Sequence, residues 1–101
     1  MEAMYFVYII ETEDGTFYTG QTNDLYRRFS EHVSGGKNGA TYLRSHKPMY
    51  LVYLEECESR GDALKRERQI QRNRRLKLHL VGNGFRRDLR EVIETERSYR
   101  L

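Results

Sequence analysis

Two short runs of aromatic and β-branched residues constrain this chain of 101 residues more than any other feature. They are Met4–Ile10 and Thr16–Thr22, and the turn-forming stretch Glu13-Asp14-Gly15 lies between them. Strand-like runs separated by a short loop that contains glycine are typical of a β-hairpin. The length of that loop decides which residues face each other.

Two registers are open for this hairpin. A two-residue turn pairs Tyr8 with Gln21 and places Tyr8 and Tyr18 on opposite faces of the sheet. A three-residue loop with Gly15 in the left-handed conformation pairs Tyr8 with Gly20, and both tyrosines then share one face. We predict the second register, because a type I turn followed by a bulge requires glycine at the third loop position. Gly20 either leaves open space there for a substrate backbone or only marks the end of the strand.

The residues after the hairpin predict a helix. Thr22 or Asn23 can cap it, and Asp24 in the first turn is favoured by the helix dipole. Arg28 and His32 flank the apolar stripe and neighbour each other one turn apart. The stripe that packs on the sheet recurs every fourth residue: Leu25, Phe29 and Val33.

Further along, Met49–Glu55 predicts a third strand, and Ser59 caps a helix that ends near Arg72. With 38% hydrophobic and 33% charged residues, the chain predicts one globular domain spanning residues 1–101. We expect a core over about residues 5–80 and a C-terminal amphipathic helix over about residues 85–96. The predicted fold class is α+β, a three-stranded antiparallel sheet flanked by helices.

Positive charge is concentrated on one segment. Residues 65–77 carry seven basic side chains and one acid, a net +6 against +3 for the whole chain, so the remainder is negative. Such a concentration attracts a polyanion, most commonly nucleic acid, although a basic helix face exposed to water gives the same pattern. The candidate nucleic-acid-binding residues are Lys65, Arg66, Arg68, Arg72, Arg74, Arg75 and Lys77, together with Gly20 on the hairpin.

The acid within that segment, Glu67, lies on the apolar side of its helix. The residues three and four positions away are Ala63, Leu64, Ile70 and Gln71, none of which is basic. The ordinary helical ion pair therefore lacks a partner. A partly buried carboxylate requires a cation or an arginine from elsewhere in the fold.

The cysteine content and the hydropathy of the chain indicate its expected cellular compartment. Cys57 is the single cysteine, which excludes an internal disulfide and a cysteine-based zinc cluster. No segment approaches the roughly 20 apolar residues that a membrane helix needs. A reducing cytoplasm is the expected location.

Val7-Tyr8-Ile9 and Tyr18-Thr19-Gly20 resemble the two tyrosine motifs of the GIY-YIG nuclease family, and the chain looks most similar to its small stand-alone bacterial members. The resemblance places the family's arginine at Arg28, its histidine or aromatic residue at His32 and its metal-binding glutamate at Glu67. Two positions depart from the family. A lysine that often follows the second motif is Gln21 here, and the late asparagine of several members has only Asn83 as a loose equivalent.

This resemblance implies a divalent-metal-dependent endonuclease that hydrolyses DNA, with branched or damaged DNA among its candidate substrates. Glu67 would hold Mg²⁺ or Mn²⁺, and Arg28 would grip phosphate oxygens through its planar fork. Tyr8 would accept a proton from water while Tyr18 orients the water or a phosphate oxygen. His32, titrating near neutrality, would relay a proton or bind phosphate.

Two other classes remain open. The chain could be a nucleic-acid-binding module that keeps the scaffold without hydrolysis, which the departures at Gln21 and Asn83 motivate. It could also be a protein-interaction domain whose basic helix binds an acidic partner. Glu67 separates the nuclease from both, because a binder of DNA gains nothing from an acid at that position.

Overall fold

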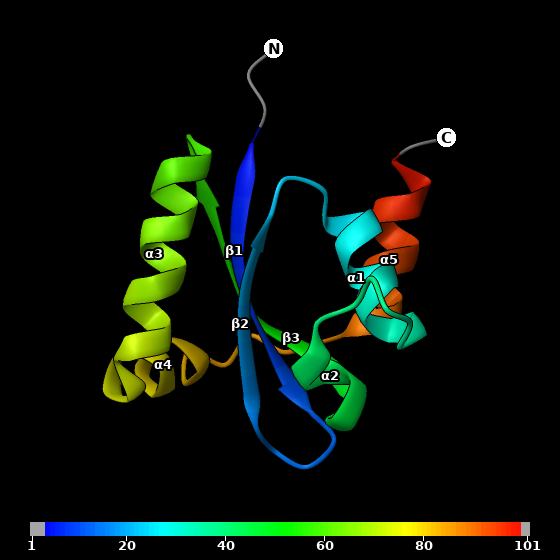
Figure 1. Ribbon diagram of the computed structural model, residues 1–101, viewed down its shortest axis with the longest axis horizontal. Helices are drawn as coiled ribbons and strands as arrows, with labels where there is room; N and C mark the ends of the chain where they lie inside the picture. The colour runs from blue at the N-terminus through cyan, green and yellow to red at the C-terminus, as the bar shows by residue number, and fades with distance from the viewer. Residues whose placement is uncertain (1–3, 100–101) are drawn as a thin grey trace.

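The computed structural model describes residues 4–99, which form an antiparallel sheet with helices on both faces (Figure 1). The α+β class is confirmed, but the sheet has four strands, in the order β2-β1-β3-β4, rather than three. The strands are β1 (Tyr5–Thr12), β2 (Phe17–Thr22), β3 (Pro48–Cys57) and β4 (Arg87–Asp88). The helices are α1 (Leu25–Ser34), α2 (Thr41–Ser45), α3 (Arg60–Arg72), α4 (Arg74–Val81) and α5 (Leu89–Ser98).

The hairpin adopts the three-residue loop. Tyr8 faces Gly20 and Ile10 faces Tyr18, so the predicted register is confirmed. The backbone N–H of Thr12 donates to the carbonyl of Thr16 at 2.9 Å, and Gly15 has φ +81°, the left-handed conformation that glycine adopts without strain. Tyr8 and Tyr18 therefore lie on the same face of the sheet.

Alternation along β1 divides the core into two layers. Tyr8 and Ile10 pack against Phe29 of α1 on one face, together with Leu51 and Leu89. On the other face Val7, Ile9 and Val52 pack against Ala63 and Ile70 of α3. Because β2 is the edge strand, groups on α1 and on α3 can meet around it (Figure 1).

The helix ends follow capping chemistry. Asp24, rather than Thr22 or Asn23, caps α1 by accepting from the backbone N–H of Arg27 at 3.0 Å. Ser59 caps α3 as predicted. Asn73 ends α3 and caps α4 through the N–H of Leu76, so the basic segment is divided between two helices.

The last helix begins later than the sequence predicts. Arg87–Asp88 pairs with Tyr50 and Leu51 of β3, and Asp88 caps α5, so the helix starts at Leu89 and Phe85 lies outside it. α5 packs on α1 and β3. Within residues 4–99, no helix has the length and apolar character needed to span a membrane.

Candidate active site

Tyr8 is buried, and its hydroxyl is held by a histidine from α1. The residue has 0% exposure, and its Oη lies 2.8 Å from the Nε2 of His32. A Cβ on Gly20 would lie only 2.5 Å from that Oη and 2.7 Å from the ring Cζ. The space above Gly20 is therefore filled by the Tyr8 phenol instead of being open to a substrate backbone, which corrects the interpretation from sequence.

The hydrogen bonds of His32 define its tautomer. Its Nδ1 accepts from the backbone N–H of Ala40 at 3.4 Å, so in the neutral ring Nε2 carries the hydrogen and donates to Tyr8. The ring is 1% exposed, and burial, with a smaller contribution from the charge of Arg28, lowers the pKa of His32 to about 3. The expectation that His32 titrates near neutrality is therefore wrong, and at neutral pH it is a fixed donor to Tyr8.

Tyr18 lies closer to solvent than Tyr8. It is half-buried, and its ring packs edge-on against His32 at 5.4 Å between centroids. Burial raises the pKa of both phenols, that of Tyr8 far above its ordinary value, whereas the charge of Arg28 lowers both. Both side chains are therefore protonated at neutral pH, and Tyr18 is the phenol that can meet a substrate.

Arg28 is fixed from two sides. Its Nη1 donates to Glu31 Oε1 at 3.0 Å and to the carbonyl of Asn38 at 2.7 Å. These contacts hold the guanidinium near the phenols while 26% of the side chain stays exposed. Glu31 could have been found from its i+3 spacing, but nothing in the sequence singled out the Asn38 carbonyl.

Glu67 reaches the same region from the other face of the sheet. α3 packs along β2, where the Gln71 amide donates to the carbonyl of Thr19 at 3.3 Å. Burial raises the pKa of Glu67, and the charges of Arg68 and Arg28 oppose that rise. The carboxylate in turn raises the pKa of Tyr8 and Tyr18, so it lies within electrostatic reach of both phenols.

The carboxylate of Glu67 has no hydrogen bond or ion pair with any residue in the range 4–99. That range also contains no cluster of three or more His, Cys, Asp or Glu side chains able to enclose a metal. A single half-buried carboxylate suits Mg²⁺, which retains several water ligands and binds through one or two carboxylates plus substrate phosphate. The donor set therefore fits a cation completed by solvent and substrate.

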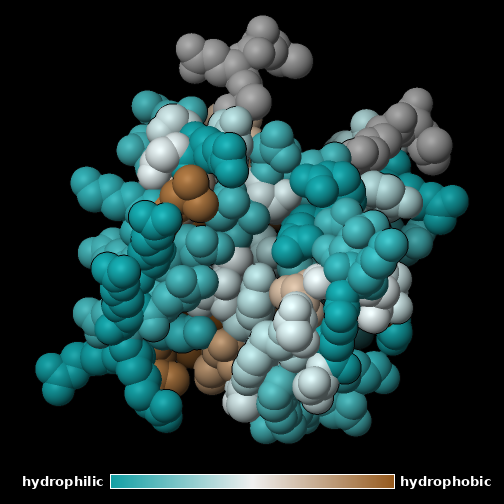
Figure 2. Space-filling model, viewed as in Figure 1, coloured by the Kyte–Doolittle hydropathy of each residue, from teal (hydrophilic) through white to brown (hydrophobic). Residues whose placement is uncertain are grey.

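The basic segment separates into engaged and free side chains. Arg66 donates to both carboxylate oxygens of Glu55 at 3.1 and 3.2 Å, and Lys77 donates to the carbonyl of Phe17 at 2.8 Å. Burial also lowers the pKa of Lys77. On the face in Figure 2, hydrophilic side chains flank the paler surface over β2. The side chains exposed to solvent are Lys65, Arg68, Arg72, Arg74 and Arg75.

Gly20→Ala tests the packing between the phenols. We expect a loss of about 1–3 kcal/mol of stability, because the new methyl group displaces a ring that His32 holds in place. Urea denaturation measures this loss. Gly61→Ala is the matched control, since only the Ser59 hydroxyl lies within 4 Å of its new Cβ, and it should be neutral or stabilising. Equal stability for both variants would show that Tyr8 has room to move.

With this geometry in place, comparison with known proteins defines the class. The family described as the GIY-YIG catalytic domain matches residues 4–79. The chain therefore belongs to the GIY-YIG catalytic domain family, which the spacing of the two tyrosine motifs suggested. Membership indicates the nuclease superfamily in general.

The relatives carry names that state no function. UPF0213 protein DP2720 of Desulfotalea psychrophila is 52% identical over 65% of this chain and 59% of its own length, so this chain spans less than two thirds of that relative. UPF0213 protein VNG_2274C of Halobacterium salinarum is 45% identical over 66% of this chain and 84% of its own length. The solution structure of UPF0213 protein BH0048 from Bacillus halodurans superposes with a TM-score of 0.51 at 38% identity, covering 80% of this chain and 85% of that one.

Proposed function

We propose that this protein is a divalent-metal-dependent endonuclease that hydrolyses phosphodiester bonds in DNA. The observation that carries the proposal is Glu67, a half-buried carboxylate with a raised pKa and no hydrogen bond or ion pair among the described residues, within electrostatic reach of two phenols and a guanidinium. A carboxylate in that setting destabilises the fold unless a cation binds it. Family membership supports the same reaction class.

Each side chain has a role that its position supports. Arg28 binds the non-bridging oxygens of the scissile phosphate with donors that Glu31 and Asn38 leave free. Tyr18, half-exposed and within electrostatic reach of Arg28, orients the attacking water, and it accepts the proton of that water only in its phenolate form. Tyr8 is too buried to take that role, which the sequence interpretation gave it, and instead fixes the position of Tyr18 with His32.

A bound Mg²⁺ or Mn²⁺ would be held by Glu67, and it would stabilise charge on the phosphate and lower the pKa of nearby water and phenol groups. This contribution is needed because burial has raised the pKa of Tyr18 above its ordinary value. Arg28 lowers that pKa but does not overcome the effect of burial. Removing the divalent ion with EDTA should therefore stop cleavage while DNA binding persists.

Plasmid nicking in the presence of Mg²⁺ or Mn²⁺ is the direct test. Single-stranded, duplex and branched substrates should be compared, since no base-reading element is evident and sequence-specific cleavage is not expected. Cleavage of any of them that requires both the ion and Glu67 supports the proposal. A protein that binds DNA in a salt-dependent way and cuts none of these substrates is a binding module instead.

The binding module is the second candidate, and the exposed basic side chains favour it. Arg68 and Arg72 lie on α3, and Arg74 and Arg75 on α4, all free of the ion pair that engages Arg66. A surface of this kind binds phosphate backbones without any catalytic group. It does not explain an unpaired carboxylate within electrostatic reach of Arg28, and for that reason we place hydrolysis first.

We further propose that the chain acts as a single domain in the cytoplasm. Each described helix, from α1 to α5, contributes apolar side chains to one of the two core layers on the sheet. Cys57 is partly buried, and burial raises the pKa of its thiol, as expected for an inert packing residue in a reducing compartment.

Glu67→Gln should raise the stability of the protein at neutral pH. Because the folded pKa is raised, the wild-type carboxylate destabilises the fold above that pKa, and the effect fades as the pH falls through the folded pKa toward the ordinary value of 4.5. We expect a melting temperature a few degrees higher for the variant at pH 7, with the difference shrinking near pH 4. Differential scanning calorimetry at both pH values measures it. A variant that melts lower at pH 7 would indicate that a protein group already compensates the charge.

A further inference from the structure

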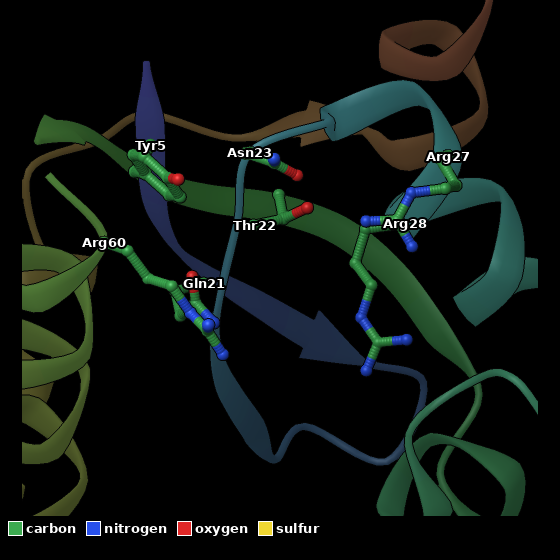
Figure 3. Close-up of a pocket in the computed structure, with 7 residues that line it drawn as sticks. All are labelled: Tyr5, Gln21, Thr22, Asn23, Arg27, Arg28 and Arg60. Atoms are coloured by element: carbon green, nitrogen blue, oxygen red, sulfur yellow. The ribbon is translucent and has the colours of Figure 1, made fainter. Parts of the chain in front are cut away.

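A polar cavity of about 410 Å³ adjoins the candidate active site at the end of β2. Figure 3 shows its walls: Arg60 reaches from the start of α3 toward Gln21 of β2, whereas Arg27 and Arg28 extend from α1 on the other side of the strand. Its volume lies within the range of ordinary ligand pockets. Residues far apart in the sequence thus build one concave surface around the strand end.

The lining of this cavity is cationic and carries no carboxylate. Three arginines contribute to it, and the remaining groups are neutral: Tyr5, Gln21, Thr22 and Asn23. Guanidinium groups that line one cavity from two helices match the geometry of a phosphate group better than single lysines do. The chemistry of the cavity therefore favours an anion.

Two of these arginines are available for a ligand. Arg60 has no ion pair or hydrogen bond within the described part of the chain. Arg27 lies 3.5 Å from Glu31 and 3.9 Å from Asp24, but its side chain is 53% exposed, and exposed pairs of this kind contribute little and exchange readily. Neither group must give up a strong contact to bind phosphate.

Arg28 connects the cavity to the reaction centre. It lines the cavity, and it also acts on the pKa of Tyr8 and Tyr18. A phosphate bound between Tyr18 and Arg28 would therefore have the cavity directly beside it. Along a nucleic-acid strand, the next group of negative charge is the phosphate of the adjacent nucleotide.

We infer that this cavity is a subsite for the phosphate next to the scissile one, gripped by Arg60 and Arg27. This inference rests on the proposed function and adds a substrate requirement to it. The preferred substrate is a strand with phosphates on two successive nucleotides, and an isolated phosphodiester is a poor ligand. Arg28 binds both the scissile and the neighbouring phosphate, whereas Arg60 binds only the neighbouring phosphate.

Binding of dinucleotides without any divalent ion tests the inference separately from catalysis. The thymidine dinucleotide TpT has one phosphate, whereas pTpT and TpTp carry a second one on the 5′ or the 3′ side. We expect the wild type to bind one of these two isomers about tenfold more tightly than TpT, as charged hydrogen bonds permit. Arg60→Ala should abolish that gain and leave the affinity for TpT unchanged, as measured by NMR titration in EDTA.

Arg90→Ala is the matched control, because it removes the same charge from an exposed position on α5, away from the cavity. If Arg60→Ala and Arg90→Ala weaken all three dinucleotides equally, the effect is general electrostatics and the subsite is refuted. The same conclusion follows if neither isomer gains over TpT. If no dinucleotide and no longer DNA binds, both the proposed function and the subsite are wrong. If DNA binds but is not cleaved, the dinucleotide affinities alone decide whether the subsite is supported or refuted.

Discussion

Glu67→Gln should reduce plasmid nicking by about 10²–10³-fold, the loss typical for removing one group that stabilises developing charge. Glutamine keeps the size of the side chain but removes the negative charge that holds a divalent cation. Because Glu67 makes no hydrogen bond or ion pair within residues 4–99, the substitution breaks none of the contacts that hold the fold. The measurement is the initial rate of nicking at saturating Mg²⁺, with DNA affinity determined separately in EDTA.

Arg28→Lys and Tyr18→Phe extend the same test. Lysine keeps the charge of Arg28 but loses the planar fork, and phenylalanine keeps the ring of Tyr18 but loses the group that accepts a proton. Each should slow nicking about as much as Glu67→Gln, whereas Arg90→Ala should cut at the wild-type rate. Wild-type rates in all three site variants would place the reaction elsewhere on the molecule.

The free energy of unfolding should fall by about 3 kcal/mol between pH 7 and pH 4 through His32 alone. Burial depresses the folded pKa of this residue to about 3, below the ordinary value of 6.5. In that interval the unfolded chain binds a proton that the folded protein rejects, so stability is lost as the pH falls from about 6.5 toward 3. Glu67 changes the free energy of unfolding in the opposite direction, because its folded pKa is raised. Every variant that keeps Glu67 also keeps this contribution, so it cancels when such variants are compared.

His32→Gln isolates this contribution. The glutamine amide can still accept from Ala40 and donate to Tyr8, but it does not titrate. Urea denaturation of both proteins from pH 7 to pH 4 should show that the free energy of unfolding falls by about 3 kcal/mol more for the wild type than for the variant. Protonation of Asp14 also lowers the stability, but its pKa of about 2 places that loss of stability below pH 4. Parallel curves would mean that His32 takes up its proton without cost in the folded state.

Local chemistry explains what could be predicted from sequence. Gly15 specifies the three-residue loop, and alternation along the strands then places Tyr8 and Tyr18 on one face, whichever elements pack on them later. Ser59 and the period of the apolar residues likewise fixed the start of α3. Spacing along one helix also brought Arg28 and His32 to the same edge.

Errors arose where partners come from distant segments. β4 has two residues and no pattern of its own, so it exists only because β3 offers an edge. The ordinary pKa of histidine predicts that His32 titrates near neutrality, but the fold buries the ring, and hydrogen bonds with Tyr8 and Ala40 set its tautomer. Nothing in the sequence singles out Arg60, because only folding places it in the cavity that Arg27 and Arg28 line.

The sequence by itself determined the first three strands, the helix after the hairpin, the hairpin register and the types of side chain available for phosphodiester chemistry, because these depend on residues within a few positions of one another. The tertiary structure decided which side chains share a cavity and which of them meet water. Both properties depend on how α1 and α3 close around the edge of β2, and this packing sets the burial of each ionisable group. Burial in turn determines its charge state.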